Sequence, residues 1–342
     1  HVFLSARNRA INVHWIYNPN AVDMKIVFYL IVFLSPLFIQ GQNLYRFGHY
    51  NFTKSIYNPA ALGADASFTA DLVYRNQWRG IDGAPQTAAL NASYDLNQTM
   101  AVGINFYNDR IGLNQTNSFS AQYSYRLLFD ERKYLAFGVG LGGDNFAWNW
   151  NSANANLAND PVFSGSYSVF RFNGSFGMYY RTPRFYAGLS IPQFFQNTNQ
   201  SSRLDVKQLH YQFMSGYYFE LSEDFILSPS AQLKIVPNAP LQADLLVRGI
   251  YQFMGLSLGY RTENSFLIGI ECLLKEKVRV GYMFNYDIGK LARVKGGSSE
   301  IYLGLGLPYY FNKTERSKYI GKNGGFNKGY KKAAKKQQLR RP

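Results

Sequence analysis

Apolar and polar side chains alternate with a period of two residues along most of the chain. Residues 117–127 place Phe119, Ala121, Tyr123, Tyr125 and Leu127 on one face, opposite hydroxyl, amide and arginine side chains. Residues 170–181 repeat the pattern with Phe, Met and Tyr on the apolar face. Because successive side chains of a strand point to opposite faces, both stretches predict β-strands with one apolar and one polar side. No stretch shows the 3.6-residue period of an amphipathic helix.

The same template predicts about fourteen strands, which gives an even number and an all-β fold. The expected strands lie near residues 67–78, 86–96, 100–107, 116–127, 134–146, 169–181, 185–191, 208–221, 225–236, 241–251, 254–261, 265–273, 277–286 and 299–311.

The connections between these strands alternate in length. Long loops are expected after the first, third, fifth, seventh and thirteenth strands, and tight turns such as "RTPR", "SED" and "LKEK" follow even-numbered strands. Long loops at one end and short turns at the other are typical of an antiparallel outer-membrane β-barrel.

Charged residues within the strands all fall on the less apolar face. Arg or Lys facing lipid at mid-depth costs about 2–4 kcal/mol, so a bilayer would enforce this segregation. The charges are therefore expected to face a lumen, with Trp78 in an interfacial aromatic girdle. The residues concerned are Asp71, Arg75, Arg126, Arg171, Glu220, Lys234, Asp244, Arg248, Glu271 and Arg279.

The final predicted strand, "EIYLGLGLPYYF", is apolar on one face throughout and ends in aromatic residues. Tyr309 and Phe311 are expected to form the signal that barrel-insertion machinery recognises. Pro229 lacks a donor for the strand ladder, so a bulge is expected there. The alternative fold is a secreted β-sandwich, which explains the alternation but not the loop asymmetry together with an export signal.

The N-terminal region predicts a secretory signal. Met24 opens an apolar run from Ile26 to Ile39, which is shorter than the ~20 residues of a membrane-spanning helix. Residues 24–41 are therefore expected to be a signal peptide, and residues 1–23 to lie upstream of the true start. A permanent membrane anchor is the alternative. Residues 42–66 then precede a barrel expected over 67–311.

The formal net charge is +15, and most of it belongs to the C-terminal end. Residues 312–342 contain eleven Lys and Arg residues and a single acid, Glu315. The segment lacks an apolar pattern and is expected to be a disordered basic tail, either solvated or anion-binding. An even-stranded barrel would place it in the periplasm, where nucleic acid is absent. Cys272 is the only cysteine, which excludes an internal disulfide and a thiolate metal cluster.

Motifs that could carry chemistry are weak. Gly138, Gly140 and Gly143 match the dinucleotide fingerprint, but no helix is expected after them. His49 and His210 are the only histidines after the predicted signal, and neither has a spaced Ser or Asp partner. No enzyme, cofactor or metal site is predicted. Lumen-facing glycines of the predicted strand at 134–146, together with Gly255, Gly259, Gly304 and Gly306, instead suggest that the wall passes close to another backbone.

Three motifs near the start of the predicted barrel are distinctive: Tyr57-Asn58-Pro59-Ala60, Arg75-Asn76-Gln77-Trp78 and Asp82-Gly83-Ala84-Pro85. With "VGINFYNDRIG", "LSPSAQLKIVPNAPLQADLLVRGIYQ" and "SSEIYLGLGLPYYF", they make residues 55–311 resemble the PorP/SprF outer-membrane proteins of the Bacteroidetes type IX secretion system. The basic tail departs from that family's pattern.

The resemblance implies a non-enzymatic, multi-pass barrel of the Gram-negative outer membrane. Its partners would be membrane lipid, type IX secretion components and a cognate secreted protein or a surface adhesin used in gliding motility. A passive channel or small-molecule transporter is the alternative. Residues 43–63 are expected to fold into the pore as a plug, with Tyr57 and Pro59 fixing its turn.

Overall fold

The computed structural model describes residues 46–130, 133–149, 166–193, 209–222, 224–236, 239–262, 264–275, 277–288 and 296–307. The expected signal peptide, the residues upstream of it, the basic tail, Tyr309 and Phe311 lie outside the described residues.

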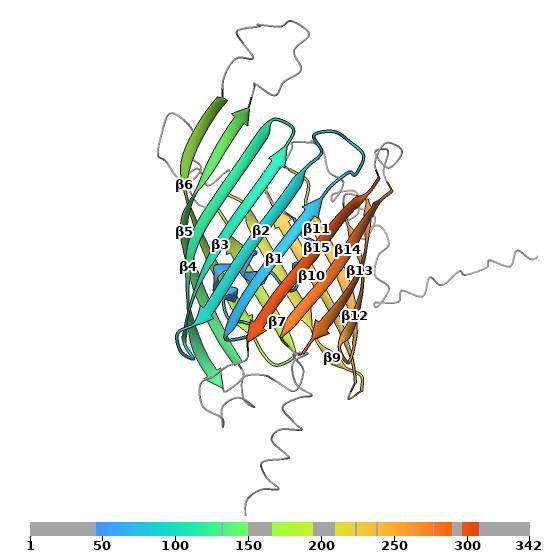
Figure 1. Ribbon diagram of the computed structural model, residues 1–342. Helices are drawn as coiled ribbons and strands as arrows, with labels where there is room; N and C mark the ends of the chain where they lie inside the picture. The colour runs from blue at the N-terminus through green and yellow to red at the C-terminus, as the bar shows by residue number, and fades with distance from the viewer. Residues whose placement is uncertain are drawn as a thin grey trace, which may run out of the picture. The chain divides into compact units, whose positions relative to one another are not determined.

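The described chain is almost entirely β-structure (Figure 1). Its strands are β1 (Phe68–Asn76), β2 (Gln86–Asp95), β3 (Met100–Ile111), β4 (Asn114–Asp130), β5 (Lys133–Asn149), β6 (Ser166–Arg181), β7 (Phe185–Ile191), β8 (Tyr211–Tyr217), β9 (Phe219–Glu220), β10 (Phe225–Ile235), β11 (Gln242–Tyr251), β12 (Met254–Arg261), β13 (Ser265–Leu274), β14 (Val278–Asp287) and β15 (Ser298–Leu307).

The sheet closes on itself as an antiparallel barrel, because β1 pairs with β15 and β10 pairs with β11. β8 and β9 keep one register against β10, since Gly216 faces Ser230 and Glu220 faces Ile226. They are therefore one strand interrupted at Tyr218, and the barrel has the fourteen strands that the sequence predicts. Each strand of the closed ring pairs with a neighbour on both sides, which is what a bilayer requires of a β-protein.

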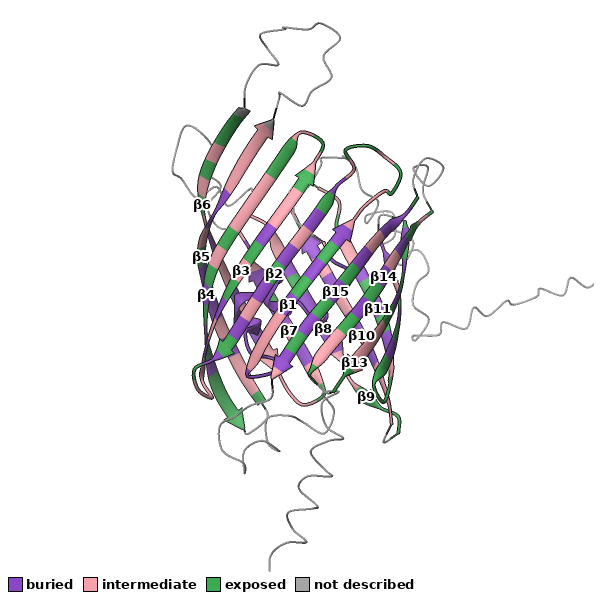
Figure 2. Cartoon of the chain, in the orientation of Figure 1, coloured by how far each residue is buried: buried purple, intermediate pink, exposed green. Residues whose placement is uncertain are grey.

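The two faces of the wall differ as the alternation predicts. In β1, Leu72 and Tyr74 are exposed on the outside, whereas Asp71, Val73 and Arg75 are buried inside. Figure 2 shows the same alternation of exposed and buried residues along the neighbouring strands. The exposed large apolar side chains gather on the outer surface, where lipid would replace water.

Of the charged residues expected to face inward, those within the long strands do so. Asp71, Arg75, Arg126, Lys234, Asp244 and Arg248 are buried, and Arg171, Glu271 and Arg279 are half-buried. Glu220 in the short β9 is exposed, with its carboxylate 3.6 Å from the Arg184 guanidinium.

Connections of different length lie at opposite ends of the barrel. β1, β5, β7 and β14 end at the same end of the barrel, called the loop end, where residues 77–85 follow β1. β2, β6 and β11 end at the other end, called the turn end, where residues 96–99, 182–184 and 252–253 form short turns.

The expected long loop after the third strand is wrong. Only Gly112 and Leu113 separate β3 from β4, and the ladder continues through pairs such as Asp109 with Thr116. The polar run there resembles a loop by composition, but ladder hydrogen bonds join main-chain groups and tolerate polar side chains.

The expected bulge at Pro229 is also wrong. Pro229 pairs with Val247 in a continuous register between β10 and β11. On the other side, the ladder to β8 and β9 is interrupted between Gly216 and Phe219, so the missing proline donor coincides with a gap in pairing. A register shift occurs instead between Leu128 and Asp130 of β4.

Two short helical turns precede β1, α2 (Lys54–Tyr57) and η1 (Pro59–Ala61). None of the helices in the described residues has the length and apolar character needed to cross a membrane.

Candidate functional site: the occupied lumen

Residues 46–67, called the inner segment, lie inside the ring of strands, as the blue coil in Figure 1 shows. Residues 47–64 are all buried. Arg46 contacts β11 near the loop end, whereas the carbonyl of Ser67 accepts from the Asp95 amide at the turn end. The inner segment therefore runs along the lumen from the loop end to the turn end before the chain enters β1.

The bend of the inner segment follows from its local sequence. Asn58 is the N-cap of η1, and its side-chain oxygen accepts a hydrogen bond from the Ala60 amide at 2.9 Å. Pro59 follows at the first helical position, where its fixed φ and missing amide are both suited to the turn. Gly63 then takes a φ of +64°, and an added Cβ there would collide with Asp95 and Arg126.

The Asn58 amide also binds the wall. It donates to the carbonyls of Met178 and Leu189 at 2.9 and 3.4 Å, in β6 and β7. Glycines make room for this contact, because an added Cβ at Gly177 would collide with the Asn58 side chain. At Gly138 in β5 an added Cβ would collide with the main chain of Pro59 and Ala60.

At the loop end, charged groups hold the start of the inner segment. Asp244 lies between two guanidinium groups, with Arg46 at 2.5 Å and Arg261 at 2.8 Å. Glu300 accepts from the main-chain amides of Gly48 and His49, both at 2.8 Å, and from His49 Nδ1 at 2.5 Å. These carboxylates are almost completely buried, so each depends on its partners for compensation.

At the turn end, a second set of charges holds the other end. Lys54 Nζ lies 2.8 Å from the Asp65 carboxylate, and Arg181 lies 3.2 Å from it. Burial raises the pKa of Asp65, but the two cations outweigh burial and hold that pKa well below its usual range.

A third ion pair at this end joins Arg126 to Asp95, with nitrogen–oxygen distances of 2.6 and 3.1 Å. The same guanidinium donates to the Leu62 carbonyl at 2.7 Å. A wall ion pair thereby also fixes the main chain of the inner segment.

Aromatic and hydroxyl groups fill the space between these ends. The guanidinium groups of Arg248 and Arg279 lie 4.8 and 4.2 Å from the centre of the Phe52 ring. Tyr50 and Asn51 both hydrogen-bond to the Ser230 hydroxyl, at 3.0 and 2.9 Å. The lumen is therefore packed at this level.

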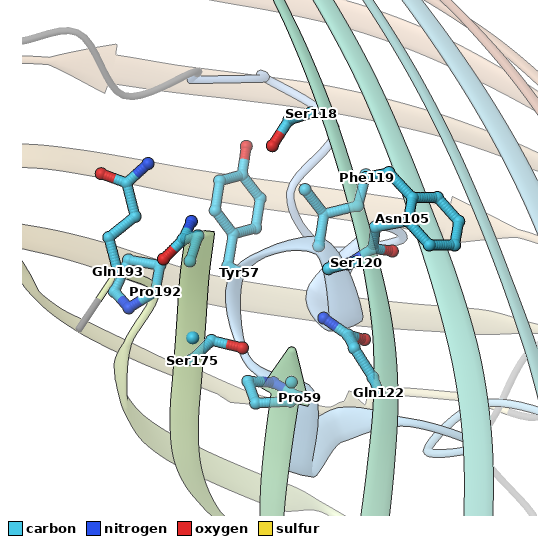
Figure 3. Close-up of a pocket in the computed structure, with 14 residues that line it drawn as sticks. Tyr57, Pro59, Asn105, Ser118, Phe119, Ser120, Gln122, Ser175, Pro192 and Gln193 are labelled. Carbon is cyan, nitrogen blue, oxygen red and sulfur yellow. The ribbon is translucent and has the colours of Figure 1, made fainter. Parts of the chain in front are cut away.

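A polar cavity of about 40 Å³ remains on the loop-end side of α2 and η1 (Figure 3). Ser118, Ser120, Ser175 and Gln122 line it, with Tyr57 on the side of the inner segment. Its size suits a few water molecules.

The family-motif residues fall into two separate groups. Tyr57, Asn58 and Pro59 are buried in the inner segment, where the Tyr57 hydroxyl accepts from the Phe47 amide at 2.8 Å. Arg75 is buried in the wall, and Asn76 ends β1 opposite Gln86 and Ser299.

The remaining motif residues belong to the connection after β1 at the loop end. The Gln77 amide donates to the Pro85 carbonyl at 2.9 Å, and the Gly83 carbonyl accepts from the Gly112 amide at 2.8 Å. Trp78 lies beyond the strand with a φ of 48°, and Asp82 is exposed. These residues shape the loop after β1.

Sequence reasoning missed the acidic residues that hold the inner segment, above all Glu300, Asp95 and Asp65. Asp95 and Glu300 lie near strand ends, and their partners are far away in sequence. Of the glycines expected to approach another backbone, Gly138 does so against the inner segment. Gly255 and Gly304 make room for the side chains of Glu271 and Tyr302 instead.

The residues that the sequence offered as candidates for cofactor binding or catalysis lie in the barrel wall or beside it. Gly138, Gly140 and Gly143 all lie within β5, with no helix after them in the described residues. Burial, assisted by Lys234, lowers the pKa of His210 to about 4. In the part of the chain that is described, no three His, Cys, Asp or Glu side chains are grouped to hold a metal ion.

Several solved structures are similar to this chain. They include the outer-membrane protein Omp33 of Acinetobacter baumannii (6% identity, 72% of this chain and 100% of that chain covered, TM-score 0.43). A FadL homologue of Pseudomonas aeruginosa matches at 10% identity (73% and 92% covered, TM-score 0.41), and the CymD monoaromatic hydrocarbon channel at 9% (75% and 94% covered, TM-score 0.43). No curated protein sequence matches the chain. A family model described as "Type IX secretion system membrane protein PorP/SprF" matches residues 39–305.

Proposed function

Because the chain belongs to the PorP/SprF family of type IX secretion system membrane proteins, we propose that it is a non-enzymatic barrel component that supports the export or surface attachment of a cognate secreted protein. Gliding machinery is one setting for such a role. The partners would be other type IX secretion components and the exported protein or adhesin itself.

The occupied lumen is the observation that carries this proposal. A diffusion channel needs a continuous water-filled path, as in porins. Here buried charges at both ends hold the inner segment, and aromatic side chains fill the middle. This arrangement favours a plugged adaptor over a passive channel or small-molecule transporter.

The proposed orientation places the loop end outside the cell and the turn end in the periplasm. It follows from the short turns that outer-membrane barrels have on their periplasmic side. The tail, residues 312–342, carries a net charge of +10 and would then lie in the periplasm. Each basic residue near an anionic surface contributes about 1 kcal/mol, so the tail would act as a salt-sensitive tether.

The test is a deletion strain whose surface and secreted proteomes are compared with those of the parent strain. We expect one or a few exported proteins to disappear from the surface or medium and to return when the intact gene is supplied. Unchanged proteomes would refute the proposed function. Loss of small-molecule uptake with export intact would favour the transporter.

A further inference from the structure

Wall side chains bind the main chain of the inner segment repeatedly. Ser190 donates to the Tyr57 carbonyl at 2.8 Å, and Asn105 and Gln122 donate to the Ser55 carbonyl at 3.4 and 3.2 Å. Glu300 accepts the two successive amides of Gly48 and His49. Main-chain groups are thus bound at several points along the lumen.

The inner face of β4 carries three of these contacts in a row. Gln122, Ser124 and Arg126 occupy alternate positions and donate to the carbonyls of Ser55, Ala60 and Leu62 at 3.2, 3.3 and 2.7 Å. Alternate residues of a strand are about 6.6–6.8 Å apart on one face, so β4 presents a regular column of donors. All three side chains are buried.

Main-chain amides and carbonyls are the same in every polypeptide, apart from the missing amide of proline. A wall that binds them recognises a polypeptide largely independently of its side chains, as in other main-chain recognition sites. The inner segment is also attached to the barrel wall covalently only through β1, because it precedes the first strand.

We propose that the inner face of β4, together with Ser190 and Glu300, is a binding site for polypeptide main chain, which the inner segment occupies until an unfolded segment of the exported protein replaces it. This inference rests on the proposed function, since it identifies what the exported protein contacts. The inner segment is then an intramolecular competitor. A short tether gives an effective concentration in the millimolar range, so a free peptide competes poorly unless the inner segment is loosened or the partner is delivered locally.

Binding is tested on the full chain in detergent micelles with a fluorescent synthetic peptide that has the sequence of residues 46–66. The loosened chain carries Arg46→Ala and His49→Ala, which weaken the inner segment and leave the wall intact. The locked chain carries Ser55→Cys and Asn91→Cys in a Cys272→Ser background, because the two native side chains lie 2.8 Å apart. Disulfide formation is verified by mass.

We expect the loosened chain to bind the peptide at least tenfold more tightly than the native chain. The oxidised locked chain should not bind, and reduction should restore binding to that of the native chain. Equal binding by the oxidised locked chain, or no binding by the loosened chain, would overturn the inference.

Main-chain recognition has its own controls. Adding Gln122→Ala and Ser190→Ala to the loosened chain should weaken peptide binding roughly tenfold, since two hydrogen bonds are lost. Ser93→Ala should not weaken it, because the buried Ser93 hydroxyl bonds Thr69 in the wall. A peptide N-methylated at the amides of Gly48 and His49 should bind more weakly to a chain that keeps Glu300. Peptide affinities that stay the same after the wall substitutions and after N-methylation would exclude recognition of the main chain.

Export in cells separates this inference from the proposed function. If the oxidised locked chain supports export as well as the native chain does, displacement of the inner segment is not required and the inference fails while the function stands. If the deletion strain exports every protein normally, the function itself fails.

Discussion

Arg46 and Asp244 form an ion pair 2.5 Å long, although 198 positions separate them in the sequence. Asp244 simultaneously accepts two hydrogen bonds from Arg261, so one carboxylate joins the inner segment to the wall. Removing that carboxylate takes an acidic partner from the half-buried Arg46 and from the buried Arg261, whereas removing Arg46 leaves the wall pair intact.

Asp244→Asn should therefore lower the free energy of unfolding by about 3–5 kcal/mol, the range for breaking a buried ion pair. Arg46→Met should lower the free energy of unfolding by clearly less than Asp244→Asn does. Urea unfolding followed by tryptophan fluorescence measures both. Equal effects of the two substitutions would show that Asp244 does not serve both arginines.

Gly138→Ala should destabilise the protein by about 1–3 kcal/mol, because the added methyl group meets the main chain of Pro59 and Ala60, which cannot rotate away. Gly249→Ala is the matched control, since a Cβ there meets only the Phe225 ring at 3.5 Å. The control should stay within about 0.5 kcal/mol of the native chain. Equal destabilisation by Gly138→Ala and Gly249→Ala would show that the inner segment does not lie against β5.

Deleting residues 46–64 should raise ion conductance in planar bilayers, because the inner segment occupies the lumen at both ends and in the middle. Truncation after Phe311 is the control and should leave both insertion and conductance unchanged, since the closing strand survives. An unchanged conductance after the deletion would mean that the inner segment does not block the pore.

Topology can be measured with single cysteines in a Cys272→Ser background. Asp82→Cys in the connection after β1 should react with a membrane-impermeant reagent on whole cells, and Arg184→Cys in the turn after β6 should react only after the outer membrane is opened. Both native side chains are exposed, so exposure alone does not separate the two sites. The opposite labelling would reverse the proposed orientation.

The Lys54, Asp65 and Arg181 cluster predicts a pH dependence. The pKa of Asp65 is depressed in the folded state, so its stabilisation is fully present above the unfolded value of about 3.9 and is lost as pH falls through the folded value. Asp65→Asn should lower the melting temperature at pH 7. The difference in melting temperature between the variant and the native chain should narrow only below about pH 4. If that difference disappeared between pH 5 and 7, the effect would belong to another titrating group.

The sequence predicts the wall of this barrel well and the contents of its lumen poorly. The alternation of residues such as Leu72 and Asp71 has one physical cause, the difference between lipid and lumen, and that cause acts at every strand. Lys54 and Asp65 follow no such periodicity, because both lie outside the strands. They pair with each other, and Asp65 also meets Arg181, 116 positions away. The loop after β3 was mispredicted for a related reason, since polarity measures the environment of side chains and not main-chain pairing.

Glu300 belongs to β15, the last strand of the described chain, and its two amide partners precede the first strand. The carboxylate that receives the inner segment is thus synthesised after every other strand has been made. When β15 pairs with β1, Glu300 is placed on the wall of the lumen, and the inner segment replaces the water that would otherwise hydrate its carboxylate. The last strand to be made therefore supplies the carboxylate on which the first part of the folded chain depends.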